Sequence, residues 1–100
     1  MQFIISPELE EYMKKKRKTA ISVEIASADH SDFEIAEMYL RLVDDETVRF
    51  LVEKKRGQVR EASYGKVVLP AYRLHYDEVI TFHLKRIWLF HKLIVDGIQM

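Results

Sequence analysis

Apolar residues recur at every second position in several separate segments, and this period constrains the fold of the chain more than any other feature. It is clearest in residues 20–26, where Ile21, Val23 and Ile25 alternate with polar side chains. It returns in residues 48–52 and 79–84. Successive side chains of a strand point to opposite faces, so each segment is predicted to be a strand with one buried face.

A helix is predicted over residues 7–17 from signals at both of its ends. Ser6 can accept hydrogen bonds from the first helical N–H groups, and Pro7 fits the first position, where no N–H is needed. Acidic residues follow at once, and a basic run closes the segment, as the helix dipole favours. Leu9, Tyr12 and Met13 supply an apolar stripe with helical spacing.

Residues 33–43 fit two structures. Ser31 and Glu34 resemble a capping box, which favours a helix. Ala36, Met38, Leu40 and Leu42 also alternate with polar side chains, which favours a strand. Periodicity alone leaves both alternatives open.

The other segments complete an α+β prediction. Turns or loops are expected at residues 27–32, 44–46 and 96–97, and a charged hairpin tip at 54–57. Shorter strands are expected at residues 59–64, as an edge strand, and at 67–69. The chain is predicted to be one domain over residues 1–100, with an N-terminal helix and a mostly antiparallel or mixed sheet or barrel-like core.

Composition excludes several classes of site. The chain has 100 residues, no cysteine, and sixteen basic against sixteen acidic side chains. Disulfides, thiol nucleophiles and cysteine-ligated metal centres are therefore absent. Zero net charge argues against nucleic acid or a membrane as the partner. No secretory signal or membrane-spanning segment is visible, so a cytoplasmic location is expected.

The order of segments resembles that of HesB/IscA-like domains, the A-type iron–sulfur carriers and their shorter relatives. The start of that family is similar to Ile4-Ile5-Ser6-Pro7-Glu8, and its first strands are similar to residues 21–26 and to IAEMYLRLVDD at 35–45. Later segments of the family resemble residues 65–69 and FHKLIVDGI at 90–98. The resemblance implies the HesB-like fold and favours the strand alternative for residues 35–43.

The chain departs from this family at its ligands. Where the family has its first cysteine, this sequence has Ala28-Asp29-His30-Ser31-Asp32, and the C-terminal cysteine pair has no counterpart. A thiolate-bound cluster needs thiolates. The resemblance therefore implies a scaffold related to iron–sulfur cluster biosynthesis, without its usual cluster chemistry and with no cofactor expected.

Asp29, His30 and Asp32 are the sharpest candidate metal ligands. One imidazole and two carboxylates can bind iron or another divalent metal without thiolates. The spacing matches no known metalloenzyme motif, and a solvated polar loop explains the same residues.

Other histidines and the basic run have ordinary explanations beside functional ones. His75, His83 and His91 recur every eight residues, too far apart along one strand to chelate together. The run from Lys14 to Lys18 offers a contact for phosphate, but it also suits the end of a solvated helix.

The largest apolar concentration is Ile87, Trp88, Leu89 and Phe90. Such a run is typical either of a core segment or of an interface anchored by Trp88 and Phe90, with a second copy or another protein as partner. The chain is therefore expected to be a non-catalytic accessory or binding module, a homodimer in its simplest form. The alternative function is metal binding by His30 with Asp29 or Asp32.

Overall fold

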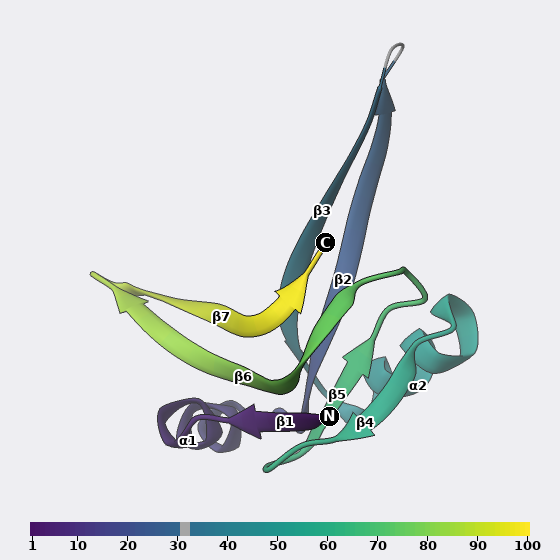
Figure 1. The fold of residues 1–100 in the computed structure, drawn as a ribbon. Helices are drawn as coiled ribbons and strands as arrows, with labels where there is room; N and C mark the ends of the chain where they lie inside the picture. Colours follow the sequence, from purple (N-terminus) through teal and green to yellow (C-terminus); the bar gives the residue numbers. More distant parts are fainter. Residues whose placement is uncertain (31–32) are drawn as a thin grey trace.

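The computed structural model describes residues 1–30 and 33–100, with side chains described for residues 1–26 and 36–100. In this part of the chain, seven strands form two sheets, and a helix accompanies each sheet (Figure 1). The α+β prediction is confirmed. The described strands form open mixed sheets and not a closed barrel.

The first sheet joins the two ends of the chain. Strand β1 (Gln2–Ile5) pairs in parallel with β6 (His75–Ile87), which pairs antiparallel with β7 (Phe90–Gln99). The β6–β7 hairpin curves away from the rest of the fold and passes over helix α1 (Pro7–Lys16) (Figure 1).

The second sheet has the order β3-β2-β5-β4. Strands β2 (Ala20–His30) and β3 (Phe33–Val43) form a long antiparallel hairpin, which Figure 1 shows projecting away from the helices. Strand β5 (Lys66–Leu69) runs parallel to β2, and β4 (Gln58–Glu61) lies at the edge, as predicted for this region. Helix α2 (Asp45–Lys55) connects β3 to β4.

The core lies where β1, β2, β5 and β6 meet helix α1. Ser63 links the two sheets there, because its Oγ accepts a hydrogen bond from the Ile5 N–H at 2.7 Å. The buried apolar side chains that form the main core cluster come from both halves of the sequence: Phe3, Ile5, Leu9, Met13, Ile21, Val23, Val67, Leu69, Leu74, Ile80, Phe82 and Ile98.

Helix α1 confirms the prediction for residues 7–17. The Ser6 side chain accepts a hydrogen bond from the Leu9 N–H, and Arg17 ends the helix in the left-handed conformation. Leu9 and Met13 are fully buried. Local signals were sufficient here because the cap residues and the apolar stripe lie within one short segment.

Helix α2 corrects the prediction of a turn at residues 44–46, a strand at 48–52 and a hairpin tip at 54–57. Asp44 is an N-cap whose carboxylate accepts a hydrogen bond from the Thr47 N–H at 2.9 Å. Leu51 is the buried residue of the helix, whereas Phe50 and Val52 are exposed. The apolar alternation over residues 48–52 therefore did not mark the buried face of a strand.

The alternatives for residues 33–43 are resolved in favour of the strand, since β3 pairs with β2 without a break from Val43 to Phe33. The loop predicted for residues 27–32 is wrong for residues 27–30, which continue β2. Backbone hydrogen bonds to β3 extend that strand, and such bonds do not require an apolar sequence.

The turn predicted at Asp96-Gly97 is also wrong, because both residues lie inside β7. The register of β6 and β7 shifts between the pairs Tyr76–Ile98 and Thr81–Asp96, so β6 bulges at this point. Gly97 has a φ of 103° and lies close to the backbone of Val79 and Ile80. Glycine at this position allows the bulge and the close approach of two backbones, and it does not mark a reversal of the chain.

Candidate functional site

The strongest candidate site is the tip of the β6–β7 hairpin, Ile87 to Phe90, which we call the hairpin tip. Ile87 and Phe90 are the last paired residues of the two strands, and Trp88 and Leu89 form the turn between them. The four side chains are 48%, 83%, 73% and 71% exposed, in chain order. The core alternative for this run is therefore wrong, and its residues are available at the surface.

Strand pairing explains why four apolar residues in a row become exposed. The inward face of the hairpin carries Phe82 and Leu84 opposite Val95 and Leu93, and these residues pack in or against the core. The hairpin continues past that core for three further residue pairs. Its end has no described element to cover it, so it contacts solvent on both faces.

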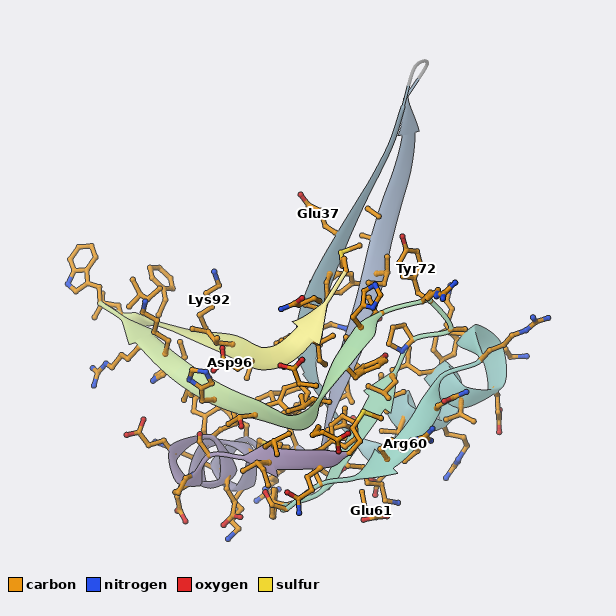
Figure 2. All side chains as sticks on the ribbon, in the orientation of Figure 1. Glu37, Arg60, Glu61, Tyr72, Lys92 and Asp96 are labelled. Atoms are coloured by element: carbon orange, nitrogen blue, oxygen red, sulfur yellow. The ribbon has the colours of Figure 1, made fainter. Side chains whose placement is uncertain are left out.

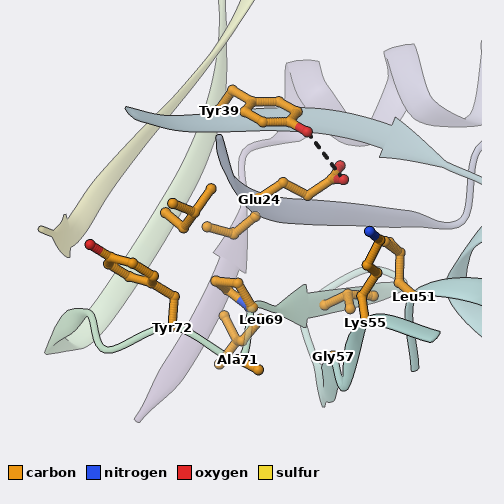
Figure 3. A pocket seen from close by; sticks show the side chains of 12 residues that line it. Glu24, Tyr39, Leu51, Lys55, Gly57, Leu69, Ala71 and Tyr72 are labelled. Atoms are coloured by element: carbon orange, nitrogen blue, oxygen red, sulfur yellow. Dashed lines mark hydrogen bonds between the residues drawn. The ribbon is translucent and has the colours of Figure 1, made fainter. Parts of the chain in front are cut away.

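A second candidate is a pocket between β2, α2 and the segment that follows β5 (Figure 3). Its volume is about 290 Å³, at the lower end of the range of small-molecule sites. Val23, Leu51 and Leu69 contribute apolar walls, and Lys55 and Tyr72 add exposed polar groups at its rim.

Glu24 supplies the carboxylate of this pocket, and three neighbours hold it. Ser22 donates a hydrogen bond to Glu24 Oε2 at 2.6 Å, and Arg41 donates from both Nε and Nη2, the latter to Oε1 at 3.1 Å. Tyr39 also donates to Oε1, at 3.4 Å (Figure 3). Burial alone would raise the pKa of Glu24, but these hydrogen bonds and the Arg41 charge outweigh it and lower the pKa below 4.5.

The consequence for chemistry is that Glu24 is a fixed, ionised group. A general acid or base works best when its pKa lies near the operating pH, and the partners of Glu24 move its pKa away from neutrality. The pocket therefore offers a bound ion pair and an apolar wall, and its carboxylate is unsuited to proton transfer at neutral pH.

The structure places the predicted metal ligands only in part. The backbone of Asp29 and His30 lies at the end of β2, where it pairs with Glu34 and Phe33. Asp32 lies outside the described residues. Among the side chains that are described, no group of three or more histidine, aspartate or glutamate residues gathers closely enough to hold a metal ion. Metal binding by Asp29, His30 and Asp32 stays a prediction.

The three evenly spaced histidines have separate environments. His83 Nε2 lies 2.8 Å from Asp96 Oδ2 across the hairpin. The His91 ring packs on Tyr12 of helix α1, with 4.9 Å between the ring centroids. His75 is exposed at the start of β6, paired with Gln99. The structure does not bring them together, in agreement with the spacing argument.

The basic run from Lys14 to Lys18 lies at the end of α1. Lys14 forms an ion pair with Glu10 at 3.1 Å, which raises the pKa of Lys14. The ammonium groups of Lys14 and Lys16 also lie over the rings of Tyr64 and Tyr12. These contacts favour the interpretation of the run as a solvated helix end.

Sequence reasoning missed the Glu24 site. Glu24 and Tyr39 are direct partners in the β2–β3 register, and Ser22 and Arg41 form the pair two residues further along. The four polar side chains therefore share one face of the hairpin. The alternation around Glu24 predicted a polar face, but the identity of its partners depended on a register that periodicity left open.

No helix in the described part of the chain is long and apolar enough to cross a membrane. Comparison of the sequence with known protein families finds no match, and comparison with curated proteins finds none either.

Proposed function

We propose that this chain is a non-catalytic binding module that docks through the hairpin tip. The observation that carries the proposal is the exposure of four consecutive large apolar residues at one end of the molecule. Aromatic side chains are enriched in binding interfaces, and an apolar group that projects into water is stabilised when a partner covers it. Trp88 and Phe90 are the expected anchors.

The Glu24 carboxylate has a structural role, which gives no support to a catalytic function at neutral pH. It is bonded by Ser22, Tyr39 and Arg41, an arrangement that stabilises the β2–β3 hairpin. The resemblance of the segment order to HesB-like domains adds a second element to the proposal. In this view, the scaffold of a cluster carrier is kept for docking, without thiolate ligands.

The homodimer predicted from the sequence is one form of this proposal. Sedimentation over a wide range of protein concentration tests it, together with the same measurement on a Leu89→Ser, Phe90→Ser variant. Association of the unmodified protein and its loss in the variant would identify a second copy as the partner. A strict monomer would eliminate that form and leave docking to a different partner.

Photo-crosslinking tests docking by the tip as such. A photoreactive amino acid replaces Leu89 in one variant and Val52 in a control variant, because Val52 is also an exposed apolar residue but lies on α2. Irradiation in cells of the native host should give specific adducts from position 89 and few from position 52. Specific protein adducts in equal yield from the two positions would contradict the proposal.

A further inference from the structure

The turn of the hairpin tip has an unusual sequence for its geometry. Trp88 has a φ of 54°, in the left-handed region that glycine and asparagine normally occupy in tight hairpin turns. A bulky residue in this conformation is strained. A large apolar side chain at a strained and exposed position is unfavourable for the turn itself. Such a conflict with local preference is typical of a functional site.

Basic residues form a collar directly behind the tip. Lys85 is the direct cross-strand partner of Lys92, and Arg86 is the partner of His91. Lys92 projects from β7 on the side away from helix α1 (Figure 2). Like charges placed opposite one another destabilise a sheet, so the Lys85–Lys92 pair has a cost in the free protein.

The collar gives this end of the hairpin a positive charge, which the zero net charge of the whole chain does not reveal. Residues 84–95 contain no aspartate or glutamate, although the chain as a whole has as many acidic as basic side chains. Glu8 and Glu11 of α1 line a hollow with Leu84 and His91, on the face of the hairpin opposite Lys85 and Lys92. Within the described residues, Lys85, Arg86 and Lys92 are exposed and have no carboxylate within ion-pair distance. The electrostatic part of the argument against a membrane partner used the net charge of the whole chain, which differs from the charge at this end of the molecule.

We propose that the hairpin tip inserts into the interface of an anionic lipid bilayer, with the collar at the level of the lipid phosphates. This inference rests on the proposed docking function and names its partner. The Lys85–Lys92 pair lies two residues behind Ile87 and Phe90, or roughly 7 Å at ~3.4 Å per residue. That spacing matches the ~5–10 Å depth at which interfacial apolar groups lie below the headgroups.

A second copy fits the tip less well than an anionic surface does. Two tips in symmetric contact would bring the unpaired lysines of both collars together. The four side chains also offer only roughly 500 Å² of contact, below the ~800 Å² per partner that a stable protein interface usually buries. A bilayer imposes no such limit, because lipid headgroups supply the negative charge and acyl chains accept the apolar residues.

The tip carries its own reporter, because Trp88 is the only tryptophan of the chain. The whole protein is titrated with vesicles of phosphatidylcholine alone and of phosphatidylcholine with phosphatidylserine at ~7:3, at ~0.1 M salt. Only the anionic vesicles should shift Trp88 emission to shorter wavelength and protect it from acrylamide. Raising the salt to ~0.5 M should weaken binding at least tenfold, since the collar is screened.

Two pairs of substitutions separate the roles of collar and tip. Lys85→Gln with Lys92→Gln should weaken binding roughly 25-fold, at about fivefold for each charge removed near the surface. Arg49→Gln with Lys54→Gln is the matched control, because it removes two exposed charges from α2 and should leave binding nearly unchanged. Leu89→Ser with Phe90→Ser should abolish insertion while far-ultraviolet circular dichroism stays that of the folded protein.

Several results would overturn the proposal. If Trp88 emission does not change with anionic vesicles, or changes equally with neutral ones, an anionic membrane is not the partner. A blue shift that depends on protein concentration without vesicles assigns the tip to a second copy instead. If the protein does not bind vesicles but position 89 still gives specific protein adducts, only the membrane inference is wrong. If there is neither vesicle binding nor any adduct, the proposed docking function is wrong as well.

Discussion

Alanine substitutions of Phe82 and Phe90, made one at a time, compare two identical side chains of one hairpin that the structure places in opposite environments. Phe82 is fully buried in the core, and replacing such a residue costs ~3–5 kcal/mol of the free energy of unfolding. Phe90 is less than one-third buried. If burial of a whole Phe side chain stabilises by ~1.5–3 kcal/mol, Phe90→Ala should cost below ~1 kcal/mol.

Thermal unfolding followed by far-ultraviolet circular dichroism measures the difference. For a chain of this size, each kcal/mol shifts Tm by ~4–8 °C, so Phe82→Ala should lower Tm by at least ~12 °C. Phe90→Ala should lower it by only a few degrees. Because Phe82→Ala risks complete unfolding, a Phe82→Leu variant, with an intermediate loss, keeps the comparison measurable.

Trp88 emission gives an independent check on the same reasoning. The side chain is exposed in the folded protein, so its emission should change little when the protein unfolds. If Phe90→Ala destabilises as much as Phe82→Ala, or if unfolding shifts Trp88 emission strongly, the tip is packed in the free protein. The docking argument would then be wrong.

Three further predictions concern other parts of the chain. Gly65→Ala should lower stability by more than ~2 kcal/mol, since Gly65 has a φ of 64° and a Cβ would lie 2.2 Å from the Thr19 carbonyl oxygen; an unchanged Tm in thermal unfolding would contradict this. Glu24→Gln should destabilise the protein most at neutral pH. The lowered pKa of Glu24 gives stability that is present above 4.5 and lost as pH falls through the folded-state value, so unfolding curves of variant and parent should converge in acid, and a constant difference would refute the role of that charge. If the metal prediction holds, elemental analysis of anaerobically purified, tag-free protein should find near-stoichiometric metal that His30→Ala removes, whereas equal retention would exclude His30.

Helix α1 and strand β2 were predictable because their signals are local. Ser6 and Pro7 define the start of α1, and Ile21, Val23 and Ile25 define one face of β2. Neither depends on what the segment packs against. The fold class followed from such segments, and the structure confirms it.

Helix α2 was missed although its signals were present. Asp44 is followed three residues later by Thr47, whose N–H it binds, but an aspartate at that place suits a turn equally well. The alternation of Val48, Phe50 and Val52 then favoured a strand. Five residues are too few to separate the two periods when the helix buries little of its own surface.

The candidate sites depended on long-range pairing that periodicity does not contain. An apolar run such as residues 87–90 is suited to a core, and only the pairing of Ile87 with Phe90 places it at the end of a hairpin. Glu24 likewise acquires its role from Arg41, seventeen residues away. Sequence reasoning identified Trp88 and Phe90 as interface candidates but left their burial open.

The parallel pairing of β1 with β6 has a consequence for synthesis of the chain. Ile5 pairs with Phe82, so β1 leaves the ribosome long before the strand with which it pairs. At ~5–20 residues per second this interval is roughly 4–15 s, far longer than a helix or hairpin needs to form. Helix α1 and the β2–β3 hairpin have mainly local contacts and can fold in that time. The sheet that carries the hairpin tip therefore closes last, and the time needed to synthesise β6 sets how long β1 stays unpaired.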